Sequence, residues 1–322
     1  MGQSAEPSES RESSTSSEPS ESRGSSASSE SSESAEPCER GVYNQVRGEI
    51  VATAQRRLTR PVRRHAPLAP LAAAYRLRRR LRPSKHTDAD PFALVEVDPT
   101  RIRRSVLETA PRIPQRGRAV GGDWDLDWNP FDERAVPRGI VQRYREGREW
   151  RETALLDAFH DQLSRFGAAW RYTDEADFER RCREIDRLYT SIRDDGYRRQ
   201  ECLHTPEAPY ATTARLDEIT VDVGRGGRLY WRGYGQHRLA IAKLLGLESV
   251  PVLLHRRHAD WQDVRDVVRK EHVTGTSREW EAAALRELSK NGNANEMNAA
   301  VDADSLLDHP DLRDVDTAGD EA

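Results

Sequence analysis

The chain has 322 residues, a formal net charge of −4 at pH 7 and three cysteines. No run approaches the roughly 20 apolar residues of a membrane-spanning helix, and the cysteines show neither a zinc-site spacing nor a disulfide framework. The composition therefore excludes membrane-spanning and disulfide-stabilised classes of protein. It predicts a soluble, cytoplasmic protein.

Both ends of the chain are expected to be flexible. Residues 1–38 are mostly Ser, Glu, Ala and Pro, a composition that cannot bury enough surface to offset the loss of chain entropy on folding. We expect a disordered tail there, and its residues do not resemble the apolar region of a secretory signal. Residues 291–322 are polar and acidic, and we expect a second flexible tail.

Residues 39–90 form a basic, Arg-rich arm or linker, with arginines concentrated between residues 56 and 82. Two interpretations remain open. The arm could bind nucleic acid or another anionic surface by neutralising phosphates. Alternatively, it is a pair of solvated basic helices joined by a Pro-rich linker, because charge runs are usually just solvated.

The globular region is expected to begin near residue 91. Leu94, Val95 and Val97 predict a short strand, and the following stretch, 111–131, is rich in Gly, Pro, Asp and Trp and predicts a loop. Apolar residues then recur at helical spacing, predicting helices at about 137–146, 149–166 and 174–195. A glycine follows each helix, and Gly196 is expected to be a left-handed cap.

The second half of the chain alternates strands and helices. Apolar and polar residues alternate over 218–223, and the Gly-rich stretch "GRGG" after them predicts a hairpin. A helix at about 236–245, a strand at 250–254 and two helices near 260–271 and 277–289 follow. The predicted fold class is α+β.

The segment "YWRGYGQHRLAIAKLLGLESVPVLL" resembles the core of the ParB/sulfiredoxin superfamily, and the loop "GGDWD" resembles a prokaryotic branch of it. The resemblance implies a small mixed sheet with packed helices over residues 91–258. It also implies a helical insertion at about 130–170, followed by C-terminal helices over 259–290. In this superfamily a helix ends in glycine, a hairpin follows, and a Gly-x-x-Arg turn opens the next helix.

The same resemblance implies a nucleotide site at this turn, formed by Gly233, Gly235, Gln236, His237 and Arg238. A glycine turn lets backbone N–H groups approach an anion, and the N-terminus of the helix adds partial positive charge. The implied ligands are CTP, ATP or ADP with Mg²⁺. The alternative is an ordinary helix N-terminus in which His237 and Arg238 have no role in binding a ligand.

One departure from the family pattern limits the implied chemistry. Sulfiredoxins place a reactive cysteine where this chain has Gln236, and without a thiolate there is no attack on a sulfinyl phosphate. Sulfiredoxin activity is therefore rejected. Partitioning proteins have Gly-Glu-Arg-Arg at the turn, so their CTP hydrolysis is in doubt here.

The loop "GGDWDLDW" supplies the candidate catalytic residues Asp123 and Asp125, with Asp127 nearby. Alternate carboxylates can hold Mg²⁺ against phosphates or act as a general base. The alternative is a turn in which the carboxylates accept from nearby N–H groups. No metal site is predicted, because the spacing of His255 and His258 does not suit a shared metal on a strand.

Three hypotheses of function follow. The first is a nucleotide-dependent phosphotransferase or hydrolase that holds phosphates at the Gly turn and uses a carboxylate of the Asp loop. The second is a DNA-associated protein that uses the basic arm without catalysis. The third is a non-catalytic scaffold, because a fold alone does not assign a function. The distance between the Asp loop and the Gly turn would discriminate best between them.

Overall fold

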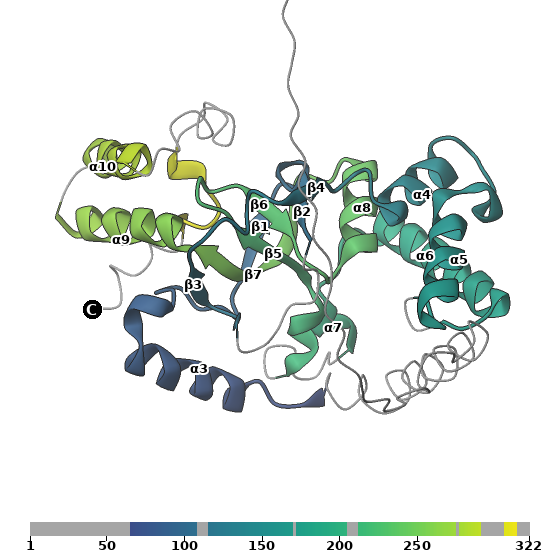
Figure 1. The fold of residues 1–322 in the computed structure, drawn as a ribbon, viewed down its shortest axis with the longest axis horizontal. Coiled ribbons are helices and arrows are strands. Elements are labelled where there is room, and N and C mark those ends of the chain that lie inside the picture. Colours follow the sequence, from purple (N-terminus) through teal and green to yellow (C-terminus); the bar gives the residue numbers. More distant parts are fainter. Residues whose placement is uncertain are drawn as a thin grey trace, which may run out of the picture.

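The computed structural model describes residues 65–107, 115–169, 172–204, 212–274, 277–290 and 306–313. The predicted N-terminal tail and most of the basic arm lie outside the described residues. Among those described, a mixed sheet of seven strands and eight α-helices form an α+β fold (Figure 1). The predicted fold class is thereby confirmed. No helix in the described part is long and apolar enough to span a bilayer.

The sheet combines parallel and antiparallel pairs in the order β1-β7-β5-β6-β2-β4, and β3 pairs with β7 outside this path. The pairs β5–β7, β2–β6 and β3–β7 are parallel, and the others are antiparallel. The strands are β1 (Leu94–Val97), β2 (Arg104–Val106), β3 (Arg118–Val120), β4 (Trp128–Pro130), β5 (Ile219–Val223), β6 (Leu229–Trp231) and β7 (Val250–His258).

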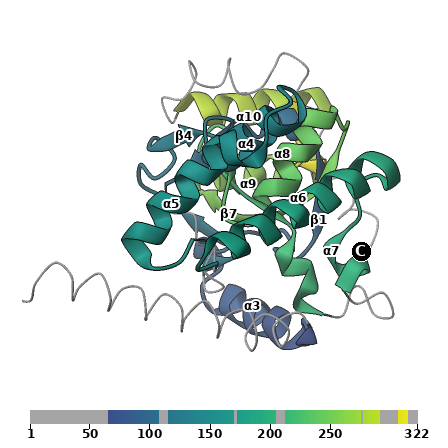
Figure 2. The same ribbon diagram turned by 90° about the vertical axis from the view of Figure 1, so that its right-hand side faces the viewer.

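Helices gather on two sides of the sheet, with α4, α5, α6 and α8 together on one side and α9 and α10 on the other (Figures 1 and 2). Helix α3 lies apart from both groups, along the lower edge of the molecule in Figure 1. The helices are α3 (Ala69–Leu81), α4 (Ala135–Tyr144), α5 (Ala154–Phe166), α6 (Glu175–Asp195), α7 (Gln200–His204), α8 (Gln236–Leu245), α9 (Ala259–Thr274) and α10 (Ser277–Lys290).

The periodic helices lie close to where the sequence predicts them, because amphipathic spacing and helix-ending glycines are local signals. Helix α5 ends at Gly167 in the left-handed conformation, and Asp174 caps the start of α6 through the N–H of Asp177. Gly196 differs from the expected left-handed cap. Its φ is 78° but its ψ is 178°, so the chain leaves α6 extended.

The predicted loop at 111–131 is wrong in part, because it contains β3 and β4. Each is only three residues long, too short for a periodic signal, and each is formed by pairing with a strand distant in sequence. β3 lies beside the end of β7, which runs to His258 rather than ending at residue 254. Consequently His255 and His258 lie within a central strand.

Central position also explains the burial of β5. Apolar and polar residues alternate along β5, yet all five of its residues are buried. Ile219, Val221 and Val223 join the main apolar core, and Asp222 is fully buried in the same strand. A buried carboxylate requires charged partners, which Arg232, directly after β6, and Arg256 of β7 supply at 2.9 and 2.8 Å from its Oδ2.

Parts of both predicted flexible or linker regions belong to the fold. Within residues 291–322, Leu306 and Leu312 are buried in the main core, so residues 306–313 are not a free tail. Within residues 39–90, α3 packs Tyr75 against a smaller core on β1 and β7 that includes Phe92 and Leu253. The helical insertion is integral too, because α4 and α5 contribute to the main core.

Candidate functional site

The Gly turn after β6 has the predicted backbone geometry. Gly233 and Gly235 have positive φ values of 77° and 73°, and α8 begins at Gln236 directly after them. A Cβ atom on Gly235 would lie 2.6 Å from Cγ1 of Ile219, so this position requires glycine for space as well as for conformation. No side chain caps the start of α8, and its first N–H groups therefore remain available to an anion.

Arg238 does not extend from this turn toward a ligand. Its Nη1 donates to Oε2 of Glu218 at 2.6 Å and to the hydroxyl of Tyr197 at 2.9 Å, and its Nη2 donates to the carbonyl of Asp217. Glu218 is fully buried and also accepts from the backbone N–H of Gln200. The guanidinium thus ties α8 to the start of β5 and the end of α6, and its fork is already occupied by protein partners.

His237 is likewise turned to the protein. Its ring nitrogens lie 3.1 and 3.3 Å from Nη2 of Arg181 on α6. Burial, reinforced by the positive charges of Arg181 and Arg238, holds the pKa of His237 well below its usual value. The ring is therefore neutral at physiological pH, so it can accept a hydrogen bond from Arg181 and brings no charge to the turn.

Gln236, the remaining side chain of the turn, lines a cavity of about 310 Å³. Residues from the start of α4 form the opposite wall. The lining residues are Asn129, Pro130, Glu133, Arg134, Ala135, Val136, Gln162 and Gln236. Because α4 begins at Ala135 and α8 at Gln236, two helix N-termini meet at the cavity. Neither has a side-chain cap.

Arg134 is the cation among the lining residues of this cavity, and no pattern in the sequence indicates its role. Its guanidinium lies 4.8 Å from the centre of the Trp231 ring, and its Nη1 donates a long hydrogen bond of 3.4 Å to Oγ of Ser105. Its Nε is buried without a hydrogen-bond partner, and it forms no ion pair with any described residue. Burial lowers the pKa of Arg134, so an anion beside it would be stabilising.

The Asp loop is held in place by one arginine. Arg225, in the turn between β5 and β6, donates from its Nε, Nη2 and backbone N–H to the carboxylate of Asp125. Asp123 accepts from the same Nη2 at 2.8 Å, although its side chain is 80% exposed. Burial favours the neutral form of Asp125, but the hydrogen bonds from Arg225 outweigh it and lower its pKa. A general base at neutral pH requires the opposite shift.

The Asp loop and the Gly turn lie at opposite ends of the β5–β6 hairpin. Asp125 lies beside Gly224, which follows the last residue of β5, whereas Gly235 lies beside Ile219, the first. At about 3.3 Å per residue, five strand residues separate the two by roughly 16 Å. The structure does not bring together the carboxylates and the turn that the enzyme hypothesis combines.

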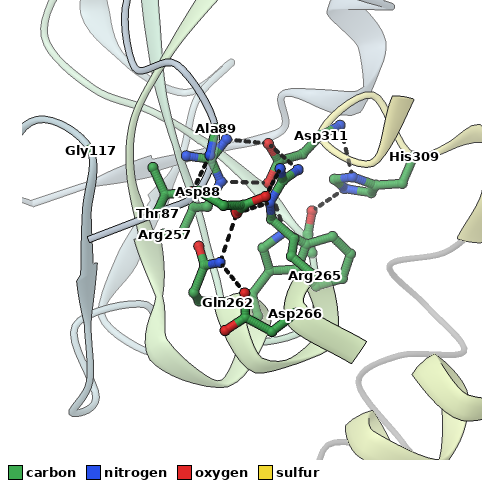
Figure 3. Close-up of polar contacts among 12 residues, drawn as sticks. Thr87, Asp88, Ala89, Gly117, Arg257, Gln262, Arg265, Asp266, His309 and Asp311 are labelled. Atoms are coloured by element: carbon green, nitrogen blue, oxygen red, sulfur yellow. Dashed lines mark hydrogen bonds and ion pairs between the residues drawn. The ribbon is translucent and has the colours of Figure 1, made fainter. Parts of the chain in front are cut away.

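The end of the hairpin near Asp125 continues into a buried network of charges (Figure 3). Asp311, from the C-terminal segment 306–313, accepts from Nε of Arg257 and Nε1 of Trp261, each at 2.8 Å, and lies 3.4 Å from Arg265. Asp88 pairs with the other side of Arg265 at 3.1 Å. Every carboxylate of this network has an arginine partner.

The two histidines of β7 have separate partners. His255 lies 3.3 Å from Oδ1 of the buried Asp222, and Nε2 of His258 lies 2.8 Å from the carbonyl of Gly122. They do not face a common point. Within the described residues, no three His, Cys, Asp or Glu side chains are grouped so that they could hold a metal ion.

The comparisons with known proteins give no further assignment. No family model matches the chain, and no curated protein or solved structure shows significant similarity to it. The resemblance to the ParB/sulfiredoxin superfamily therefore stays a prediction. Arg134 could not have been found from the sequence, because it lies about 100 residues before Gln236 and no local motif marks it.

Proposed function

We propose that this protein binds a nucleotide through its phosphates, in the cavity between the starts of α4 and α8. The proposal depends on one observation: Arg134, a partly buried guanidinium, lines the cavity and has no carboxylate partner among the described residues. Removing a charge from water is costly unless an opposite charge compensates it. A phosphate beside Arg134 would supply that charge.

Two further features support an anionic ligand of nucleotide type. The uncapped N-termini of α4 and α8 both lie at the cavity, and such N-termini bind phosphate through N–H groups and the helix dipole. The cavity volume of about 310 Å³ is at the lower end of the usual range for small-molecule sites, so we expect part of the ligand to stay exposed to solvent.

The proposed roles of the site residues differ from those implied by the family pattern. Gly233 and Gly235 shape the turn, Gln236 offers its amide to the phosphates, and Arg134 replaces Arg238 as the cation. Glu133 is the carboxylate among the lining residues, and we assign it the role of holding Mg²⁺ beside the phosphates, because Mg²⁺ prefers oxygen ligands shared with a nucleotide. Binding is proposed without catalysis, since Asp123 and Asp125 lie at the other end of the hairpin.

Calorimetric titration of the full chain with ATP, ADP and CTP in the presence of Mg²⁺ tests the proposal. Arg134→Ala should weaken binding by about 1.5–3 kcal/mol, the usual contribution of a charged hydrogen bond. Arg138→Ala is the matched control, because Arg138 is exposed one turn later on the same helix. The absence of binding below millimolar nucleotide, or equal losses in the two variants, would refute a nucleotide site at this cavity.

The alternative function, a DNA-associated protein that uses its basic arm, depends on α3 and not on the cavity. Several basic side chains of α3 have no acidic partner among the described residues.

A further inference from the structure

Helix α3 exposes an apolar stripe that the fold does not use. Ala69, Ala73, Leu77 and Leu81 recur every four residues, which places them along one face of a helix. All four are exposed, and Leu77 and Leu81 are 58% and 71% exposed. Tyr75 lies about 160° around the helix from Leu77 at 100° per residue, and it is the buried contact of α3 with the sheet.

Basic side chains border this stripe on both sides. Arg76 and Arg80 lie on one side and Arg78 on the other, and Arg82 and Lys85 follow the end of the helix. All five are exposed, and none forms an ion pair with a described residue. The face is therefore cationic at its borders and apolar at its centre.

Stability of the helix accounts for only part of this pattern. Arginines in the last turn interact favourably with the negative end of the helix dipole, which accounts for Arg78 and Arg80. The helix dipole accounts neither for Arg76 nor for the exposed Leu77 and Leu81. Exposed apolar side chains bordered by charges are typical of an interaction surface.

We propose that this face of α3 docks on an anionic phospholipid surface. A helix lying in the plane of a membrane inserts its apolar face at the level of the headgroups, while Lys and Arg on its flanks attract anionic lipids. Leu77 and Leu81 would enter the interface, and the long side chains of Arg76 and Arg80 would reach the lipid phosphates. Duplex DNA would match the charges but would leave the leucines in water, because its affinity comes from phosphate contacts.

The geometry permits such docking without rearrangement of the core. The 13 residues of α3 span about 20 Å. The helix lies along the lower edge of the molecule in Figure 1, away from α4, α5 and α10. The small core beneath it, formed by Tyr75, Phe92 and Leu253, faces away from the stripe and would stay packed.

Co-sedimentation of the full chain with lipid vesicles tests the proposal. One set of vesicles contains phosphatidylcholine alone, and the other contains equal parts of phosphatidylcholine and phosphatidylglycerol. We expect binding to the anionic vesicles only, and weaker binding as salt is raised. Both L77Q/L81Q and R76Q/R80Q should weaken it at least about tenfold, without changing the melting temperature, since these side chains are exposed.

Two control variants make the result specific to α3. Phe166→Gln removes an apolar side chain that is 63% exposed on α5, and R165Q/R183Q removes two exposed positive charges from α5 and α6. Both should bind anionic vesicles like the wild type. Absence of vesicle binding would overturn the proposal, as would wild-type binding by L77Q/L81Q. Tight binding to duplex DNA that survives L77Q/L81Q but is lost in R76Q/R80Q would assign the face to nucleic acid instead.

Discussion

The two ends of the β5–β6 hairpin present charged side chains in opposite states. At the end near Gly224, Asp125 is paired with Arg225, and the neighbouring Asp311 is paired with Arg257. At the end near Gly235, Arg134 lines a cavity and has no acidic partner within the described ranges. The sequence indicates both ends, the first by the acidic residues and tryptophans of its loop and the second by its Gly turn. We propose the second end as the ligand site.

A charged residue indicates a ligand site only once its partners in the folded chain are known. A carboxylate that accepts several hydrogen bonds from one arginine is stabilised in its charged form and is committed to structure. A guanidinium that is partly desolvated and has no acidic partner nearby is stabilised when an anion binds beside it. Both residues are charged, and they differ in the partner that Asp125 has and that Arg134 lacks among the described residues.

The largest expected effect concerns the paired end. Asp311→Asn should lower the free energy of unfolding by about 3–5 kcal/mol, because it leaves Arg257 and Arg265 buried beside a neutral group. Asp308→Asn, an exposed change three residues earlier, should alter it by less than about 0.5 kcal/mol. Urea unfolding of both variants provides the measurement, and similar values would show that the segment 306–313 is not anchored by Asp311.

Arg238 and Arg134 should separate stability from binding. Arg238→Ala leaves Glu218 buried without its cation and should lower the free energy of unfolding by about 3 kcal/mol. Arg134→Ala should leave stability nearly unchanged and weaken nucleotide binding. Thermal unfolding and calorimetric titration of both variants test this. A stable Arg238→Ala variant that has lost its nucleotide affinity would restore the phosphate clamp implied by the family pattern.

A pH effect should come from His309, whose Nε2 lies 2.8 Å from the carbonyl of Gly227. Burial lowers its pKa to about 4, although Asp311 opposes this shift. The unfolded chain therefore binds the proton first, and the stability contributed by the neutral ring is complete above pH 6.5. It declines as pH falls toward 4, by about 2–3 kcal/mol. His309→Gln should flatten unfolding free energy against pH in this window, and an unchanged slope would contradict it.

The smallest effect distinguishes the two carboxylates of the Asp loop. Asp125→Asn should lower the free energy of unfolding by about 2 kcal/mol, since it weakens a buried, charge-assisted contact with Arg225. Asp123→Asn should cost less than about 1 kcal/mol, because its side chain is exposed and its ion pair is screened by water. Chemical denaturation can resolve this difference. Equal losses would mean that burial does not decide the strength of these pairs.

The helices and turns that depend on short-range patterns can be predicted from the sequence. The helices α4, α5, α6 and α8 follow from apolar spacing and terminal glycines, and the β5–β6 hairpin follows from alternation around a Gly-rich turn. The Gly turn before α8 was also correctly placed. These features depend on residues within a few positions of one another, and short-range sterics and amphipathicity are sufficient to define them.

Two features depend on tertiary contacts: the strands that complete the sheet, and the charged side chains that lack a partner among the described residues. The three-residue strands β2, β3 and β4 exist because a distant strand offers hydrogen bonds to each of them. Likewise, Glu218 neutralises Arg238 although 20 residues separate them along the chain, whereas no carboxylate in the described part of the chain pairs with Arg134. Electrostatic energy depends on separation in space and on burial, and neither quantity can be read from the order of residues along the chain.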